Sequence, residues 1–145
     1  MAEDTKTTTT TEAPAAPVAA PKKSKKTKRV VREGQLHIKA TFNNTIVTIT
    51  DKQGGALTTS SAGRCGFRGS KKGTAYAAGI AAEKAAEDAK RDYGVAVVDV
   101  FVKGVGLGRD SAVRGVGAQN ITINSITDVT PIAHGGVRPK GERTP

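Results

Sequence analysis

The stretch QLHIKATFNNTIVTITDKQGGALTTSS, residues 35–61, decides the fold of this chain. Apolar and polar side chains alternate over 35–42, which predicts a strand with one buried face and assigns Phe42 to that face. The β-branched run at 45–51 predicts a second strand, and the pair Asn43-Asn44 favours a turn between the two. Strand, turn and strand in this order predict the start of a sheet.

The same stretch ends in a hairpin, and a helix follows it. The residues KQGG at 52–55 favour a hairpin turn, because glycine adopts the positive φ angles that such turns need, so a third strand is expected at 56–61. A loop is expected at 62–73 and a helix at 74–91, which Gly94 ends. One face of that helix carries alanines, which let a helix lie close to a sheet: Ala75, Ala78, Ala82, Ala85, Ala86 and Ala89.

The second half of the chain completes an α/β pattern. Residues 95–103 are almost continuously apolar, which predicts a strand covered on both faces. A glycine-rich turn at 104–108, a short helix at about 109–116 and a last strand at 119–127 follow. The order β-β-β-α-β-α-β favours a mixed sheet with helices on its faces.

Charge indicates the class of partner. The 145 residues include 23 Lys and Arg against 13 Asp and Glu, a net charge of +10. This excess favours nucleic acid over an anionic membrane, since no apolar run approaches the ~18 residues that span a bilayer. The N-terminus has acids and lacks the apolar segment of a secretory signal, so the cytoplasm is the expected location. Cys65 is the single cysteine, a candidate reactive thiol among basic residues, and no metal or cofactor is expected.

Composition divides the chain into three parts. We expect a disordered, basic N-terminal extension over 1–33, because its threonine run and prolines offer too little apolar surface to fold. Residues 34–130 are expected to form the α/β, RNA-binding domain. Residues 131–145 are expected to form an extended basic tail.

The main candidate contact with RNA is the loop at 64–72. It has four basic residues and no acid, its glycines let the backbone approach a phosphate, and the N-terminus of the next helix attracts anions. Arg68 is expected to matter most, because a guanidinium makes paired phosphate contacts. Aromatic residues are too scarce for a stacking platform, so phosphate contacts and shape recognition are expected. The residues predicted to contact RNA are Lys22, Lys23, Lys25, Lys26, Lys28, Arg29, Arg32, Arg64, Arg68, Lys71, Lys72, Lys103, Arg109, Arg114, Arg138, Lys140 and Arg143.

Other chemistries are less favoured by the residues. The turn at 104–108 lacks the third glycine of a dinucleotide-binding GxGxxG motif, because Arg109 stands there. Asp51, Asp99 and Asp128 lie in or at the ends of predicted strands, where a metal-dependent nuclease could use them, although such aspartates ordinarily cap turns. A nuclease and a free-standing nucleic-acid-binding regulator therefore stay open as alternatives.

Three strings carry a family resemblance: FNNTIVTITD at 42–51, GFRGSKK at 66–72, and ITDVTPI at 126–132 with HGGVRP at 134–139. In this order they resemble the eleventh ribosomal protein of the small subunit in its bacterial form. The resemblance implies a mixed five-stranded sheet flanked by helices, of the ribonuclease-H-like type, and a structural role without enzyme activity. It also implies the partners: small-subunit ribosomal RNA, neighbouring proteins of the subunit platform and, near the exit path, messenger RNA.

The chain departs from the family pattern in three places. Residues 1–21 have no counterpart in a typical member. The Gly-Pro-Gly-Pro-Gly-Arg of many bacterial members is GVGLGR here, at 104–109, so the glycines are kept and the rigidity of the prolines is lost. The tail after residue 139 is less basic than the usual run of Lys and Arg, which predicts weaker RNA binding at that end.

Overall fold

The computed structural model of the chain describes residues 29–141. The expected disorder of the N-terminal extension therefore falls mostly outside the described residues. Six of the residues predicted to contact RNA lie outside them as well: Lys22, Lys23, Lys25, Lys26, Lys28 and Arg143.

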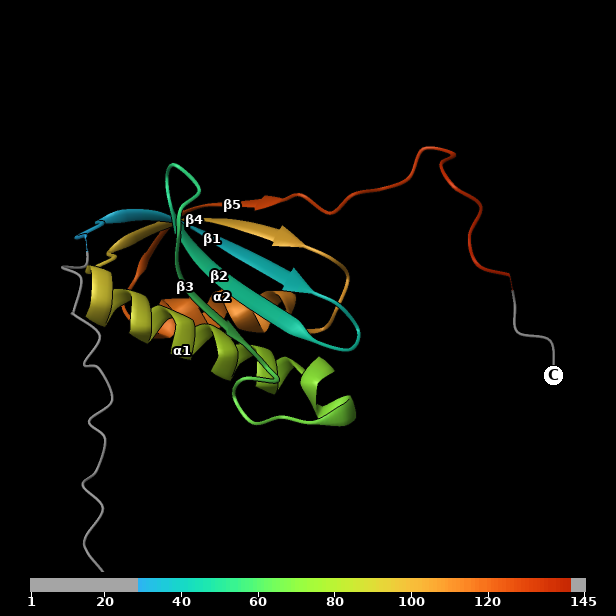
Figure 1. The fold of residues 1–145 in the computed structure, drawn as a ribbon, viewed down its shortest axis with the longest axis horizontal. Helices are drawn as coiled ribbons and strands as arrows, with labels where there is room; N and C mark the ends of the chain where they lie inside the picture. The colour runs from blue at the N-terminus through green and yellow to red at the C-terminus, as the bar shows by residue number, and fades with distance from the viewer. Residues whose placement is uncertain (1–28, 142–145) are drawn as a thin grey trace, which may run out of the picture.

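A mixed five-stranded sheet forms the centre of the molecule, as predicted (Figure 1). The strand order is β3-β2-β1-β4-β5, with antiparallel pairing among the first three and parallel pairing of β1 with β4 and of β4 with β5. The strands are β1 (Glu33–Ala40), β2 (Thr45–Asp51), β3 (Ala56–Ser61), β4 (Val97–Lys103) and β5 (Thr122–Asp128).

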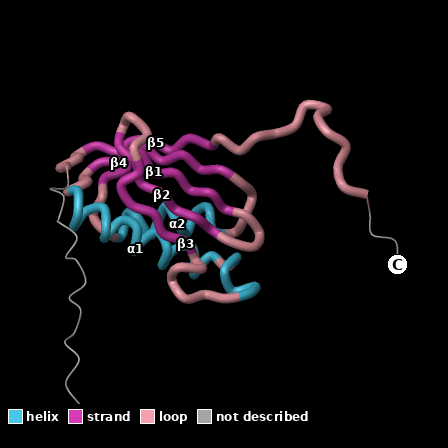
Figure 2. The backbone as a smooth tube through the Cα atoms, in the orientation of Figure 1, coloured by secondary structure: helices cyan, strands magenta, loops and turns pink. Residues whose placement is uncertain are grey.

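Two α-helices lie on the same face of this sheet, and among residues 29–141 no helix covers its other face, called the open face here (Figures 1 and 2). They are α1 (Ala75–Tyr93) and α2 (Gly108–Ala118), and a short 3-10 helix, η1 (Gly69–Gly73), lies inside the predicted loop. The expectation that β4 is covered on both faces is wrong, because Val98, Val100 and Val102 are buried while the alternate residues are only half-buried. An apolar run alone cannot reveal whether a second layer exists to cover it.

The alanine face of α1 packs against the apolar face of the sheet. Ala78, Ala82, Ala85, Ala86 and Ala89 are fully buried as predicted, Ala77 and Ala81 are buried too, and Ala75 is only half-buried. The facing strands contribute Leu36, Ile38, Val47, Ile49, Val98 and Val100 to the same apolar cluster.

The first strand, β1, ends at Ala40, two residues before the end of the predicted alternation. Leu36, Ile38 and Ala40 are buried, but Phe42 is 74% exposed, so its predicted burial is wrong. The reason is that the Asn turn begins earlier, with the amide of Thr41 donating to the carbonyl of Asn44 at 2.9 Å. Phe42 therefore lies at the tip of a loop.

The two helices pack closely and begin at the same end of the sheet. A Cβ added to Gly108, the first residue of α2, would lie 2.6 Å from the Cβ of Ala78 in the first turn of α1. One added to Gly115 would lie 2.7 Å from the carbonyl oxygen of Gly79. Within residues 29–141 neither helix is long and apolar enough to span a membrane.

Candidate nucleic-acid interface

Three loops meet at the carboxyl ends of β1 and β4. A Cβ on Gly73 would lie 2.0 Å from the carbonyl oxygen of Phe42, and one on Gly104 would lie 2.1 Å from that of Ala40. A Cβ on Gly106 would lie 2.4 Å from the carbonyl oxygen of Thr41, in the loop between β1 and β2. The glycines of the 104–108 turn thus serve close backbone contact within the protein, which accounts for them without a nucleotide.

The loop at 62–73 is buried at its two ends, at Ala62 and Gly73, and is anchored between them by Phe67. The Phe67 ring meets the Tyr76 ring edge to face, with centroids 6.0 Å apart, and its amide donates to the carbonyl of Ala62 at 3.2 Å. Gly66 and Gly69 adopt positive φ angles of 93° and 54°, which only glycine adopts readily. Between these fixed points, Arg68 lies on the surface.

The N-terminus of α1 faces the same end. Thr74 caps this helix through its hydroxyl, which accepts from the amide of Ala77 at 3.3 Å. The first turn of an α-helix has further amides without intrahelical partners and the positive end of the helix dipole, and no acid lies in this turn. Lys71 and Lys72 come directly before it, so the local field favours an anion.

Five basic side chains gather here, and we call them the basic end: Lys39, Arg68, Lys71, Lys72 and Lys103. Lys39 of β1 stands directly beside Lys103 of β4 in the parallel register. None of the five has an ion pair within residues 29–141, whereas Lys52 pairs with Glu33, and Arg91 pairs with Asp88 and Asp92. Positive charge is therefore uncompensated at this end.

Sequence reasoning missed Lys39. It was visible only as a polar residue of an alternating strand. Its meaning depends on the pairing of β1 with β4, in which Lys39 lies beside Lys103, 64 positions later in the chain. No local pattern reports that register.

Other predicted contact residues lie away from the basic end. The guanidinium of Arg64 donates to the carbonyl of Thr59 at 2.8 Å, on the far edge of the sheet. Arg114 lies in the groove between the two α-helices, with Tyr76 and Ile80. Arg29 and Arg32 precede β1, at the opposite end of the sheet, and Arg138 and Lys140 lie in the exposed segment after β5.

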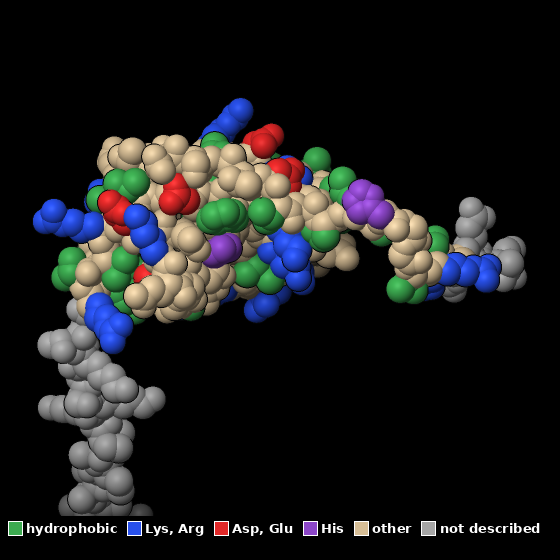
Figure 3. Space-filling model, turned by 90° about the horizontal axis from the view of Figure 1, so that it is seen from above, with side chains coloured by type: hydrophobic (Ala, Val, Ile, Leu, Met, Phe, Trp, Pro, Cys, Tyr) green, Lys and Arg blue, Asp and Glu red, His purple; other side chains and the backbone are tan. Residues whose placement is uncertain are grey.

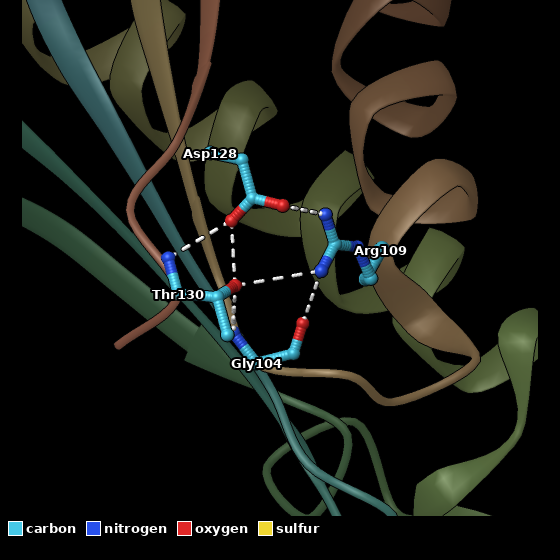
Figure 4. A network of polar contacts seen from close by, with 4 residues as sticks. All are labelled: Gly104, Arg109, Asp128 and Thr130. Atoms are coloured by element: carbon cyan, nitrogen blue, oxygen red, sulfur yellow. Dashed lines mark hydrogen bonds and ion pairs between the residues drawn. The ribbon is translucent and has the colours of Figure 1, made fainter. Parts of the chain in front are cut away.

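Arg109 is engaged inside the protein (Figure 4). Its guanidinium donates to the carbonyl of Gly104 at 2.5 Å and forms an ion pair with Asp128. The Thr130 hydroxyl donates to Asp128 at 2.5 Å and accepts from the amide of Gly104 at 3.0 Å. Hydrogen bonds from Thr130, and then from Arg109, lower the pKa of Asp128 from 3.8 to about 2. This network fixes the start of the tail against the glycine turn.

The three aspartates considered for a nuclease are separated. Asp51 accepts from the amides of its own hairpin turn, at Gln53 and Gly55. Asp99, on the open face of β4, accepts hydrogen bonds from the side chains of Asn124 and Ser125, and these bonds lower its pKa. Asp128 belongs to the network with Arg109, at the opposite end of the sheet. In the described part of the chain no group of three His, Cys, Asp or Glu side chains is placed to hold a metal.

Comparison with known proteins decides the family. The sequence profile described as ribosomal protein S11 matches residues 34–144. The chain belongs to the ribosomal protein S11 family. A relative named small ribosomal subunit protein uS11, from Francisella tularensis subsp. novicida (strain U112), is 58% identical over 115 residues, which are 79% of this chain and 88% of the relative. The protein of the same name from Acinetobacter baumannii (strain AYE) is 59% identical over 115 residues, 79% of this chain and 89% of the relative.

The S11 match confirms the resemblance carried by the three strings. It begins within β1 and includes the three loops at the basic end and the whole described tail. Of the glycines that the S11 resemblance keeps at 104–108, Gly104 and Gly106 lie against the backbone of Ala40 and Thr41, and Gly108 lies against Ala78 of α1.

Proposed function

We propose that this S11-family chain is a structural, non-enzymatic constituent of the small ribosomal subunit that binds ribosomal RNA mainly through phosphates at its basic end. The observation that carries the proposal is the uncompensated charge of Lys39, Arg68, Lys71, Lys72 and Lys103 beside the N-terminus of α1. Phosphate is the ligand that such a combination binds best. The names of the relatives support the small subunit as the site of assembly.

The wider setting follows the family resemblance. The expected position is the subunit platform in the cytoplasm, beside other platform proteins and near the exit path of messenger RNA. Residues 34–130 are the RNA-binding domain of this proposal, and the basic segment before β1 and the tail after residue 130 are its arms. The separation of Asp51, Asp99 and Asp128 gives a nuclease no support.

The test is the salt dependence of binding to a fragment of small-subunit RNA. Each phosphate neutralised contributes about 0.7–0.9 to the slope of log K against log salt, so five contacts give a slope of about −3.5 to −4.5. Affinity should then fall about 100- to 500-fold between 50 and 200 mM salt. A flat response would refute the proposal.

A further inference from the structure

The open face of the sheet carries an aromatic pair that the scarcity of aromatic residues in the sequence concealed. His37 of β1 and Phe101 of β4 are paired in register, with ring centroids 5.3 Å apart and planes inclined by 14°. Two coplanar rings side by side cannot approach so closely, so the rings are stacked with an offset and stand up from the sheet. Figure 3 looks onto this face and shows hydrophobic and histidine side chains near its centre, with Lys and Arg side chains beside them.

The stack leaves one outer ring face on either side. The residue paired with His37 on β2 is Thr48, and the residue paired with Phe101 on β5 is Thr127. Both are short, and Thr127 is exposed, so neither covers the ring beside it. A flat π-system can therefore continue the stack from the Phe101 side.

Positive charge lies one step further along the same two strands. Lys39 and Lys103 follow His37 and Phe101 by two residues, point to the same open face, and are neighbours in register. Two residues along a strand are about 6.6 Å, comparable to the reach from a base to its own phosphate. Like charges on paired strands are unfavourable unless an anion lies between them. Asp99, which lies on this face two residues before Phe101, is on the other side of the rings from the lysines and accepts hydrogen bonds from Asn124 and Ser125.

We propose that the open face binds an unpaired RNA nucleotide, whose base stacks on Phe101 and whose phosphate lies between Lys39 and Lys103. This inference rests on the proposed function and adds to it a single-stranded element that the phosphate contacts of the basic end do not require. An acidic segment of a protein would satisfy the lysines but would need an aromatic residue at a matching distance from its acid, whereas every nucleotide carries both a flat base and a phosphate, so RNA is the partner that fits both features.

The experiment compares single-stranded with duplex RNA. The probes are a fluorescent oligouridylate of about ten nucleotides, within the site sizes usual for single-strand binders, and the same strand paired with oligoadenylate. Phe101→Leu keeps an apolar side chain and removes the ring. It should weaken single-strand binding about 5- to 150-fold, the usual effect of losing one stacked base, and change duplex binding less than about twofold. Tyr93→Leu, which removes a half-buried ring at the opposite end of α1 from the basic end, is the matched control and should leave both affinities unchanged.

Charge is tested separately. Lys39→Gln with Lys103→Gln should lower the single-strand salt slope by about 0.7, the contribution of the one phosphate that they share. Lys52→Gln with Lys84→Gln, with the same loss of net charge at other exposed positions, should not change it. If Phe101→Leu melts too low to assay, His37→Gln removes the other ring at an exposed position and should weaken the single strand alone.

The outcomes separate this inference from the proposed function. Normal, salt-dependent binding of small-subunit RNA by the wild type, with equal single-strand affinity for wild type and Phe101→Leu, overturns the stacking site and leaves the proposed function standing. Equal losses from Tyr93→Leu and Phe101→Leu also overturn it. A Phe101→Leu variant that binds every RNA normally but enters subunits poorly would assign the face to a protein and overturn it as well. Wild-type protein that binds neither probe nor small-subunit RNA overturns both proposals.

Discussion

The packing of α1 against α2 gives a stability prediction with an internal control. Gly115 lies within α2, where alanine would ordinarily stabilise a helix by about 0.8–1 kcal/mol over glycine. Its Cβ, however, would lie 2.7 Å from the carbonyl oxygen of Gly79 and 3.3 Å from the Cβ of Ala82. Both contacts involve groups that cannot rotate away, so the helices must move apart.

Forcing one methyl group into a packed interior costs about 1–3 kcal/mol. Gly115→Ala should therefore lower the free energy of unfolding by about 0–2 kcal/mol after the helix-propensity gain is subtracted. Gly117, two residues later in the same helix, has no atom within 4 Å of an added Cβ. Gly117→Ala should keep the propensity gain without the clash.

The difference between the two variants isolates the clash, because the propensity gain largely cancels. That difference should be about 1–3 kcal/mol, or roughly 4–12 °C in Tm for a domain of this size. Urea unfolding followed by circular dichroism, with thermal melts alongside, measures it. A Gly115→Ala protein as stable as Gly117→Ala would show that the two helices do not pack as closely as described. The placement of both helix N-termini at the same end of the sheet would then be unsupported.

Three further predictions concern the interface. Arg68→Ala should weaken binding of small-subunit RNA by about 1–3 kcal/mol while changing unfolding by less than about 0.5 kcal/mol, and Arg91→Ala, at the other end of α1, should leave affinity unchanged; the reverse ranking would remove Arg68 from the interface. The pKa of Asp128 is lowered from 3.8 to about 2, so the ionised carboxylate stabilises the fold fully when the pH is above 3.8, and this stabilisation is lost as the pH falls toward 2. The Tm difference between wild type and Asp128→Asn should therefore shrink between these two pH values. A difference that stays constant would contradict the network. Deleting residues 1–21 should leave subunit assembly intact, whereas deleting residues 22–29 should impair it. The second deletion keeps Arg32, whose carbonyl accepts hydrogen bonds from the amides of Ala96 and Val97. Equal assembly defects from the two deletions would give the first segment a role.

Local patterns predicted most of the fold because its elements are stabilised locally. The alternation through Leu36 and Ile38 reports a buried face directly, and the alanines of α1 report theirs. The turn at Asn43 and Asn44 was predicted from residue type, but the position at which β1 ends depends on a hydrogen bond from Thr41 that composition does not reveal. That bond explains the exposure of Phe42.

The candidate site was predicted less completely, because much of it depends on register. The pairs Lys39–Lys103 and His37–Phe101 exist only because β1 and β4 are parallel neighbours at one particular offset. Arg109 was predicted as a phosphate contact from its place beside a glycine turn, yet the path of the chain after β5 brings Asp128 and Thr130 to its guanidinium. Contacts between distant segments decide both cases, and single-sequence patterns do not encode them.

The most direct test of the central claim is sedimentation of a lysate from cells that express this chain, through a sucrose gradient at high magnesium concentration. The protein should run with small ribosomal subunits. Variants lacking the charges of Lys71 and Lys72 should shift toward the top of the gradient as salt is raised, because fewer phosphates are neutralised. Wild-type protein that stays at the top of the gradient at low salt, with intact subunits in the same tube, would contradict the account.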